Sequence, residues 1–258
     1  MGDALPLLQI RDLNKLFGGL VAVTGLDLDV SEGEILGLIG PNGAGKSTVL
    51  NMIGGTILPT RGKIVFNGED ITKLPSYIRA QQGIARVFQQ DILFANLTVI
   101  ENLLVGLHLH LRMGFVGTFL KRYTPVGKEM ELASQTLEFT GLAQHFDELA
   151  KNLPHGKQRL LGLAIALATQ PKLLLLDEPV TGMNAEEMEA ILTLVKVVRE
   201  RRGITSIIVE HNLRAVMSVC DRIAVLNFGG KIAEGSPKEV VGNPAVIEAY
   251  LGTEEDAA

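Results

Sequence analysis

The sequence has a single cysteine, no excess of basic residues and no visible secretory signal. Cys220 has no second cysteine to pair with, which excludes an intramolecular disulfide and most metal sites built from cysteine. We expect it to pack in the core. The formal net charge of -5 gives no basic footprint, so we expect no nucleic-acid partner.

Segments that would direct the chain into or across a membrane are also missing. Met1 to Arg11 lacks the basic region, apolar core and cleavage site of a secretory signal. The stretch nearest to a membrane span, Leu103 to Leu120, carries His108, His110 and Arg112 at its middle, where such groups are costly in hydrocarbon. We therefore expect a cytosolic location and interpret this stretch as an interfacial segment or part of a subdomain.

Composition indicates an ordered globular chain. Hydrophobic residues make up 47% of the 258 residues, and no internal repeat or low-complexity tract is visible. A chain of this length can bury a large core. It predicts either one large α/β domain or a domain with a small subdomain.

The segment from Gly40 to Thr48 fits the phosphate-binding pattern G-x-x-x-x-G-K-[ST] at every fixed position. An apolar run from Glu34 to Ile39 predicts a buried strand before it, and a helix can continue from Ser47 to Ile53. Glycines let successive N–H groups turn toward phosphate oxygens, and the helix start adds the positive end of its dipole. We expect the nucleotide contacts to come from Asn42, Gly43, Ala44, Gly45, Lys46, Ser47 and Thr48.

Apolar runs predict further strands and one helical region. Leu8 to Phe17 and Gly25 to Val30 indicate an antiparallel piece before the phosphate loop, because the second alternates apolar and acidic residues. From Leu97 to Gly141 the composition changes to helical spacing interrupted by glycine and proline, which predicts an inserted helical subdomain. The other predicted strands are Lys63 to Gly68, Ile84 to Phe88, Lys172 to Leu176 and Thr205 to Val209, with a crossover helix from Glu186 to Arg201.

Acidic residues and a histidine follow two of these buried strands. Asp177 and Glu178 come after one, and His211 follows the other. Chemistry in parallel sheets gathers at the carboxyl ends of strands. Asp177 can complete the Mg²⁺ shell that Ser47 begins, and Glu178 can polarise water for attack on the γ-phosphate. The alternatives are a carboxylate pair that caps the next helix and a packed or surface histidine.

These motifs, in this order over nearly the whole chain, resemble the nucleotide-binding subunit of an ABC transporter. The resemblance includes Gln89 at a strand end, the segment from Leu153 to Arg159, the run Leu-Leu-Leu-Leu-Asp-Glu-Pro and Glu210-His211. It implies an α/β P-loop NTPase core with a mostly parallel sheet, an antiparallel piece near the N-terminus and a helical subdomain. The expected organisation is one domain over residues 1–258, with 97–160 as the inserted subdomain.

The resemblance also implies roles for individual residues. Phe17 would stack on adenine, Val23 would bind the nucleotide, and Gln89 would touch Mg²⁺ and the lytic water. Glu178 would be the catalytic carboxylate and His211 the switch histidine near the γ-phosphate. ATP and Mg²⁺ are the implied cofactors. Contacts to the ATP of a partner chain would come from Pro154, His155, Gly156, Lys157 and Asn184.

The segment from Leu153 to Arg159 departs from the family pattern Leu-Ser-Gly-Gly-Gln. Pro154 stands in place of the serine and His155 in place of the first glycine, while Gly156 is retained. The missing hydroxyl removes one donor to the partner's γ-phosphate, although N–H groups at a helix start can still bind the anion. Asn184 also replaces the aspartate that many members have.

Within the family the sequence is most similar to importer subunits for branched-chain or similarly hydrophobic amino acids. The similarity rests on Phe-Gly-Gly-Leu-Val-Ala-Val, the insert from His108 to Lys128, Val-Thr-Gly-Met-Asn and the ending Asn-Pro-Ala-Val-Ile-Glu-Ala-Tyr-Leu-Gly. It implies a peripheral protein at the cytoplasmic face of the membrane. Its partners would be permease subunits, a second ATPase subunit of the same or another kind and, indirectly, a periplasmic or extracellular solute-binding protein. The alternatives are a soluble ATPase of DNA repair or translation and a separate-subunit exporter.

Overall fold

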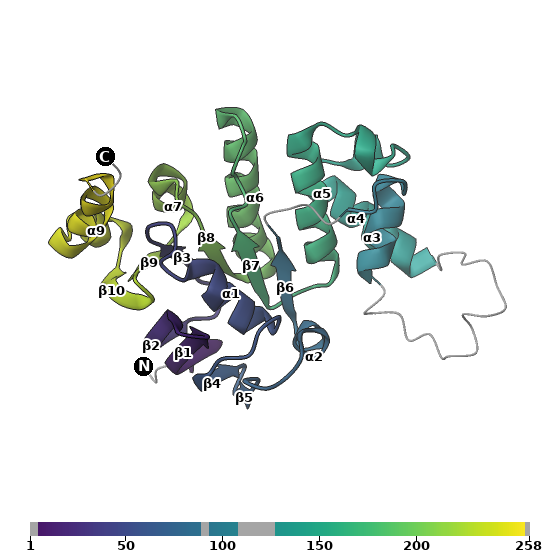
Figure 1. Ribbon diagram of the computed structural model, residues 1–258. Coiled ribbons are helices and arrows are strands. Elements are labelled where there is room, and N and C mark those ends of the chain that lie inside the picture. Colours follow the sequence, from purple (N-terminus) through teal and green to yellow (C-terminus); the bar gives the residue numbers. More distant parts are fainter. Residues whose placement is uncertain (1–4, 89–92, 108–126, 256–258) are drawn as a thin grey trace. The chain divides into compact units, whose positions relative to one another are not determined.

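The computed structural model describes residues 5–88, 93–107 and 127–255, which form two compact units (Figure 1). The first unit combines residues 1–86 with 172–258, and the second comprises 87–171. The predicted subdomain over 97–160 falls within the second unit. Most of the insert expected from His108 to Lys128 lies outside the described residues.

The first unit contains an antiparallel sheet with the strand order β2-β1-β4-β5. Leu26, Leu28 and Val30 are buried while Asp27 is exposed, so the alternation read from the sequence is confirmed. The second strand begins earlier than predicted, at Leu20. The strand bounds are Leu8–Phe17 for β1, Leu20–Val30 for β2, Arg61–Phe66 for β4 and Glu69–Asp70 for β5.

A second, mainly parallel sheet has the order β10-β9-β3-β8-β7-β6. Strand β3 pairs in parallel with β8 and β9, and β8 pairs in parallel with β7. The hairpin of β9 and β10 is antiparallel and was not predicted. The bounds are Ile35–Ile39 for β3, Ile84–Val87 for β6, Leu173–Asp177 for β7, Thr205–Val209 for β8, Arg222–Asn227 for β9 and Gly230–Gly235 for β10. The predicted α/β class, with its antiparallel piece near the N-terminus, is confirmed.

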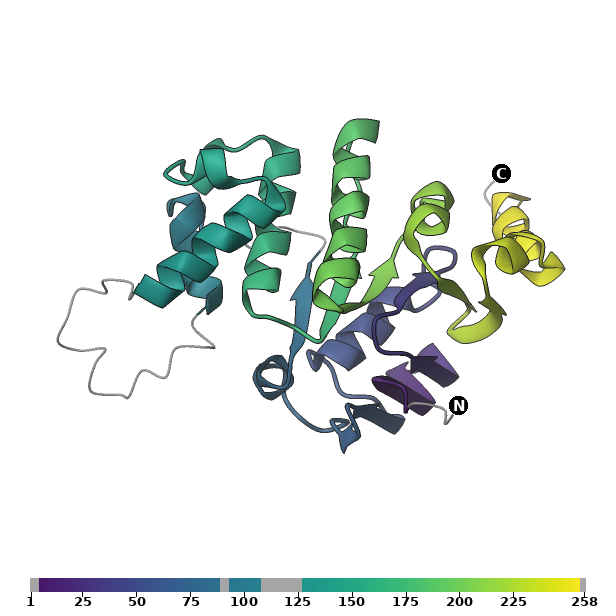
Figure 2. The ribbon, with the colours of Figure 1, turned by 180° about the vertical axis from the view of Figure 1, so that it is seen from behind.

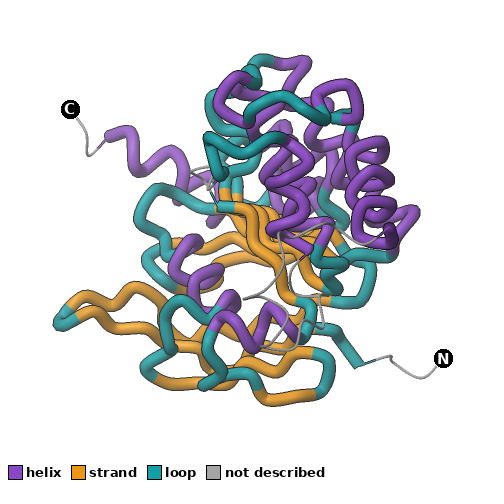
Figure 3. The backbone as a smooth tube through the Cα atoms, turned by 90° about the vertical axis from the view of Figure 1, so that its right-hand side faces the viewer, coloured by secondary structure: helices purple, strands orange, loops and turns teal. Residues whose placement is uncertain are grey.

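Helix α1 (Lys46–Gly54) packs between the two sheets (Figures 1 and 3). Leu36 and Leu38 of β3 belong to the same buried cluster as the apolar side chains of α1. Because side chains alternate along a strand, Gly37 faces the opposite side of the sheet. A Cβ at Gly37 would lie 2.7 Å from Cγ1 of Val216, which belongs to helix α7 (Leu213–Val219) on that side. Only glycine therefore permits β3 and α7 to approach this closely.

Several helices surround the sheets of the first unit. Helix α6 is the long helix that runs beside β7 and β8 when the chain is seen from behind (Figure 2). It begins with a capping box in which Asn184 accepts from the N–H of Glu187 and the Glu187 carboxylate accepts from that of Asn184. The helix bounds are Ser76–Gln81 for α2, Ala185–Arg202 for α6, Leu213–Val219 for α7, Pro237–Val241 for α8 and Pro244–Glu255 for α9.

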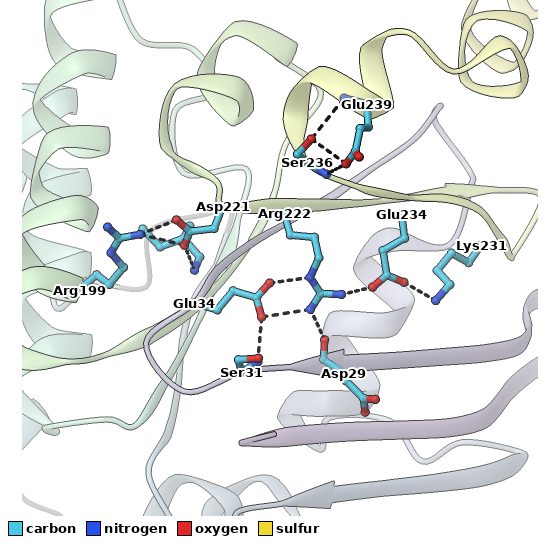
Figure 4. Close-up of polar contacts among 11 residues, drawn as sticks. Asp29, Ser31, Glu34, Arg199, Asp221, Arg222, Lys231, Glu234, Ser236 and Glu239 are labelled. Atoms are coloured by element: carbon cyan, nitrogen blue, oxygen red, sulfur yellow. Dashed lines mark hydrogen bonds and ion pairs between the residues drawn. The ribbon is translucent and has the colours of Figure 1, made fainter. Parts of the chain in front are cut away.

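A polar network joins the two sheets of the first unit (Figure 4). The Arg222 guanidinium of β9 donates to Oε1 of Glu34 at 2.8 Å and to the carbonyl of Asp29, at the end of β2, at 2.5 Å. Glu234 of β10 accepts from both Arg222 and Lys231. These contacts attach β2 to the β9–β10 hairpin.

Cys220 lies at the end of α7 and is only 7% exposed, in accord with the core position expected for it. Burial, with Asp221 and Glu34 nearby, raises the pKa of its thiol to about 12. The reactive thiolate is therefore almost absent at neutral pH. We expect a thiol-specific reagent to label the folded protein slowly and the protein unfolded in guanidinium chloride rapidly. Rapid labelling of the folded chain, followed by absorbance, would contradict the buried position.

The described part of the second unit is mainly helical. Helix α3 (Val99–Gly106) opens with a capping box of Thr98 and Glu101. A Cβ at Gly106 would lie 2.9 Å from Cγ2 of Ile165 and 3.0 Å from its carbonyl oxygen, so α3 and α5 pack closely there. The other helices are α4 (Gly127–Thr140), α5 (His155–Ala168) and the short 3-10 turns Ala143–His145 and Ala150–Asn152. Within the described ranges, no helix has the length and apolarity needed to cross a membrane.

Candidate functional site

The phosphate-binding pattern forms a loop between β3 and α1 in the first unit. A Cβ at Gly40 would lie 2.1 Å from the carbonyl oxygen of Leu226, so this position requires glycine. Gly45 is the N-cap of α1 with a φ of 100°, and no side chain caps the helix. The N–H groups of the first turn are thus open to an anionic ligand.

Lys46 is buried at the first position of α1. Its ammonium donates to the carbonyls of Gly40 at 2.7 Å and Pro41 at 2.8 Å, and the residue is 7% exposed. Burial lowers the pKa of Lys46, while Glu178 and Asp177 oppose that shift. The positive charge is therefore held inside the loop, where a phosphate would compensate it better than the carbonyls do.

Asp177 ends β7 and holds two partners with its two carboxylate oxygens. Its Oδ1 accepts from the Ser47 hydroxyl at 3.3 Å, and its Oδ2 accepts from the Arg86 guanidinium at 2.7 Å. Arg86 donates in turn to Oδ1 of Asn51 at 2.6 Å. The hydroxyl and the carboxylate oxygen that face each other are the hard ligands that Mg²⁺ prefers.

Only part of a Mg²⁺ shell is expected from protein groups. The described residues contain no cluster of three or more metal-ligating His, Cys, Asp or Glu side chains. Mg²⁺ commonly takes one or two carboxylates and completes its octahedron with phosphate oxygens and water. Ser47 and Asp177 therefore fit a metal that arrives with a nucleotide.

Glu178 follows Asp177 in an unusual backbone conformation, with a φ of +50°. Its N–H donates to the carbonyl of Val209 at 2.9 Å, and its carboxylate accepts from the Thr181 hydroxyl at 3.3 Å. Nδ1 of His211 lies 3.9 Å from Oε1 of Glu178. Because β7 and β8 are adjacent and parallel, their ends bring the predicted glutamate and histidine together.

The predicted base-binding residues differ in their surroundings. Phe17 is 47% exposed, with the Lys15 ammonium over its ring, 4.9 Å from the ring centre. Val23 is fully buried, and its Cγ2 lies 3.3 Å from where a Cβ of Gly45 would be. A cavity of about 340 Å³ is lined by Phe17, Leu20, Val21, Ala22, Asn42, Gly43, Ala44, Gly45, Lys46, Ser47, Thr48 and Glu178, and Val23 is not in this lining.

Two of the remaining predicted site residues cap helices. Pro154 is the N-cap of α5 in the second unit, and its carbonyl accepts from the N–H groups of Lys157 at 2.9 Å and Gln158 at 3.0 Å. The Asn184 side chain caps α6. Gln89 lies outside the described residues.

Three polar residues at this site were assigned no role in the sequence analysis. Arg86 and Asn51 extend the contacts of Asp177, and Glu210 accepts from the Val180 N–H at 3.0 Å. Burial raises the pKa of Glu210, which is 1% exposed. The sequence did contain a signal for two of them. Arg86 lies inside a predicted apolar strand and Glu210 directly follows one, and a charged residue that is buried in this way needs a polar partner.

Together these features define a P-loop nucleotide-binding ATPase: a phosphate loop before a helix, a strand-end aspartate facing the loop's serine, and a glutamate next to a histidine. Comparison with known families agrees. The chain belongs to the ABC transporter family, whose model matches residues 23–181. A second family model, described as branched-chain amino acid ATP-binding cassette transporter, matches residues 231–256.

Known relatives support this assignment along the whole chain. The high-affinity branched-chain amino acid transport ATP-binding protein BraF of Pseudomonas aeruginosa is 40% identical over 96% of this chain and 98% of its own length. The ADP conformation of an ATP-binding cassette of an ABC transporter has a TM-score of 0.86 at 33% identity, over 96% of this chain and 100% of that chain. A dimeric bacterial ABC transporter cassette has a TM-score of 0.75 at 27% identity, and the match covers 89% of this chain and 98% of that chain. The predicted resemblance to ABC transporter ATPases is confirmed.

Proposed function

We propose that this chain is the ATP-hydrolysing subunit of an importer for branched-chain or similarly hydrophobic amino acids. The observation that carries the proposal is the match of residues 231–256 to the branched-chain amino acid cassette family, together with the similarity to BraF over nearly the full length. The subunit would lie at the cytoplasmic face of the membrane. It would work with permease subunits, a second ATPase subunit and, indirectly, a solute-binding protein.

The positions of the site residues support a different role for each group of them. Lys46 and the N–H groups of the phosphate loop would bind the β- and γ-phosphates, while Phe17 would stack on the base. Ser47 and Asp177, with Gln89 as expected from the family, would hold Mg²⁺, which neutralises charge on the phosphate oxygens.

Glu178 would orient and activate the attacking water. Glu178 lines the same cavity as Lys46 and Ser47 of the phosphate loop. His211, 55% exposed at its side chain and 3.9 Å from Glu178, would contact the γ-phosphate. A water between a carboxylate base and the phosphorus is the arrangement that in-line attack requires.

We infer that hydrolysis needs two chains, with Leu153 to Arg159 of one copy facing the γ-phosphate bound to the other. Pro154 and His155 supply no hydroxyl donor there, so the isolated homodimer should be weak. We expect a monomer in dilute solution, slow basal hydrolysis and faster hydrolysis when a permease holds two cassettes at high effective concentration.

Specific ATPase activity measured against protein concentration tests this mechanism, and it should rise with concentration. Gly156→Asp would place a carboxylate against the partner's phosphate and should abolish hydrolysis without reducing nucleotide binding by the monomer. Exchange at the exposed Glu138 of α4, Glu138→Gln, is the matched control and should change neither property. A flat dependence of specific activity through the monomer range would contradict the two-chain mechanism.

Uptake of labelled leucine tests the transport function. Cells that lack this chain should take up less leucine, and the intact chain should restore uptake while Glu178→Gln should not. Normal uptake in cells without the chain, with unchanged levels of the other subunits, would leave the ATPase assignment standing and reject the substrate class. Leucine efflux that depends on the chain would favour an exporter.

A further inference from the structure

Two hydrogen bonds from the end of β8 hold the turn that carries Glu178. The N–H of Glu178 donates to the carbonyl of Val209 at 2.9 Å, and the N–H of Val180 donates to Oε1 of Glu210 at 3.0 Å. The two acceptors belong to consecutive residues, and His211 comes next. The turn after β7 is thus attached at two points to the segment that leads into the histidine.

The attachment matters because the backbone of Glu178 is strained. Its φ of +50° lies in the left-handed region, which residues with a Cβ rarely adopt unless the surroundings hold them there. The Thr181 hydroxyl bonds the Glu178 carboxylate from within the same turn, so it moves with the turn. Val209 and Glu210 hold the turn from outside, each through a hydrogen bond to a backbone N–H.

Glu210 occupies a position where a charge is costly. The residue is 1% exposed, it forms no ion pair with the described residues, and its Oε2 has no hydrogen-bond partner among them. A buried carboxylate of this kind costs stability compared with an apolar residue. The Glu210 carboxylate also interacts with the backbone of Asn212 and with the charge of His211 in its own segment. Its hydrogen bond from the Val180 N–H is the contact that reaches the turn after β7, which points to a role in the geometry of that turn.

We propose that Glu210 is a positioning residue for hydrolysis, which holds the turn from Glu178 to Thr181 so that the Glu178 carboxylate stays beside His211. The proposal rests on the proposed role of Glu178 as the residue that activates water. This role requires a side chain at position 210 that is long enough to place an acceptor oxygen at the Val180 N–H. It does not require that side chain to be negatively charged.

Two substitutions separate reach from charge. Glu210→Gln keeps an acceptor oxygen at the same distance and removes the charge, whereas Glu210→Asp keeps the charge but is one methylene too short. We expect kcat of the glutamine variant within about threefold of the wild type and kcat of the aspartate variant at least about tenfold lower, because small misplacement of a catalytic group is costly. The Kd for ATP, measured with a fluorescent analogue, should be unchanged in both.

The matched control is Glu34→Gln. Glu34 is also a glutamate with little exposure, but it pairs with Arg222 away from the phosphate loop. This variant should lower the thermal unfolding midpoint without changing kcat. A loss of kcat in Glu210→Asp that exceeds any loss in the control at equal thermal stability would identify positioning and not general destabilisation.

A double variant connects the effect to Glu178. In the Glu178→Gln background the activating carboxylate is already gone, so adding Glu210→Asp should lower the residual single-turnover rate by less than about twofold. A further tenfold loss in that background, or an aspartate variant as active as the glutamine variant, would overturn the proposal. Full hydrolysis by Glu178→Gln would instead reject the proposed role of Glu178.

Discussion

Lys46→Ala should lower kcat/KM for ATP by about 10²-fold or more, because it removes the buried charge that faces the phosphates. The fold should stay intact. Burial lowers the pKa of Lys46, which means that the empty protein binds this proton less well than the unfolded chain does. The charged form therefore costs stability at neutral pH, which offsets the loss of its hydrogen bonds to the carbonyls of Gly40 and Pro41, so the unfolding midpoint should change little.

Nucleotide binding by fluorescence and thermal unfolding by calorimetry check the two parts of this prediction. Lys63→Ala is a suitable control, since Lys63 pairs with Asp70 at the surface and is 56% exposed at its side chain. That variant should bind and hydrolyse ATP as the wild type does. If Lys46→Ala retains normal turnover, the phosphate loop is not the site of hydrolysis.

Glu178→Gln should retain ATP binding and lose hydrolysis by at least about 10²-fold, since the amide cannot accept a proton from water. The hydrogen bonds that hold the turn are kept, because the N–H of Glu178 is unchanged and an amide oxygen can still accept from Thr181. With ATP bound and not consumed, two chains should remain associated around the nucleotide.

Size-exclusion chromatography with and without ATP, together with the rate of phosphate release, measures both effects. Glu200→Gln, at an exposed position of α6, carries the same chemical change away from the site and should behave as the wild type. A Glu178→Gln variant that neither binds ATP nor associates would show that Glu178 supports the structure of the loop and is not the residue that activates water.

Features carried by contiguous residues were predictable without the structure. The phosphate loop is a local pattern, and its glycines, lysine and serine follow one another in the chain, so their roles follow from the spacing alone. The apolar runs before Asp177 and His211 predicted buried parallel strands, and strand polarity then required both residues to lie at one edge of the sheet. The α/β class followed from the same runs.

The tertiary structure alone decided which polar groups meet across the sheet. Arg86 and Asp177 are bonded although they are 91 residues apart, and Glu210 reaches a backbone N–H 30 residues away. Such contacts depend on strand order and register, which local periodicity does not encode. Val23 was expected from the family to bind the nucleotide, and the structure shows its side chain fully buried beside Gly45 and outside the lining of the cavity. A local pattern specifies the chemistry of a loop, whereas the partners that orient each catalytic group are specified by the pairing of distant strands.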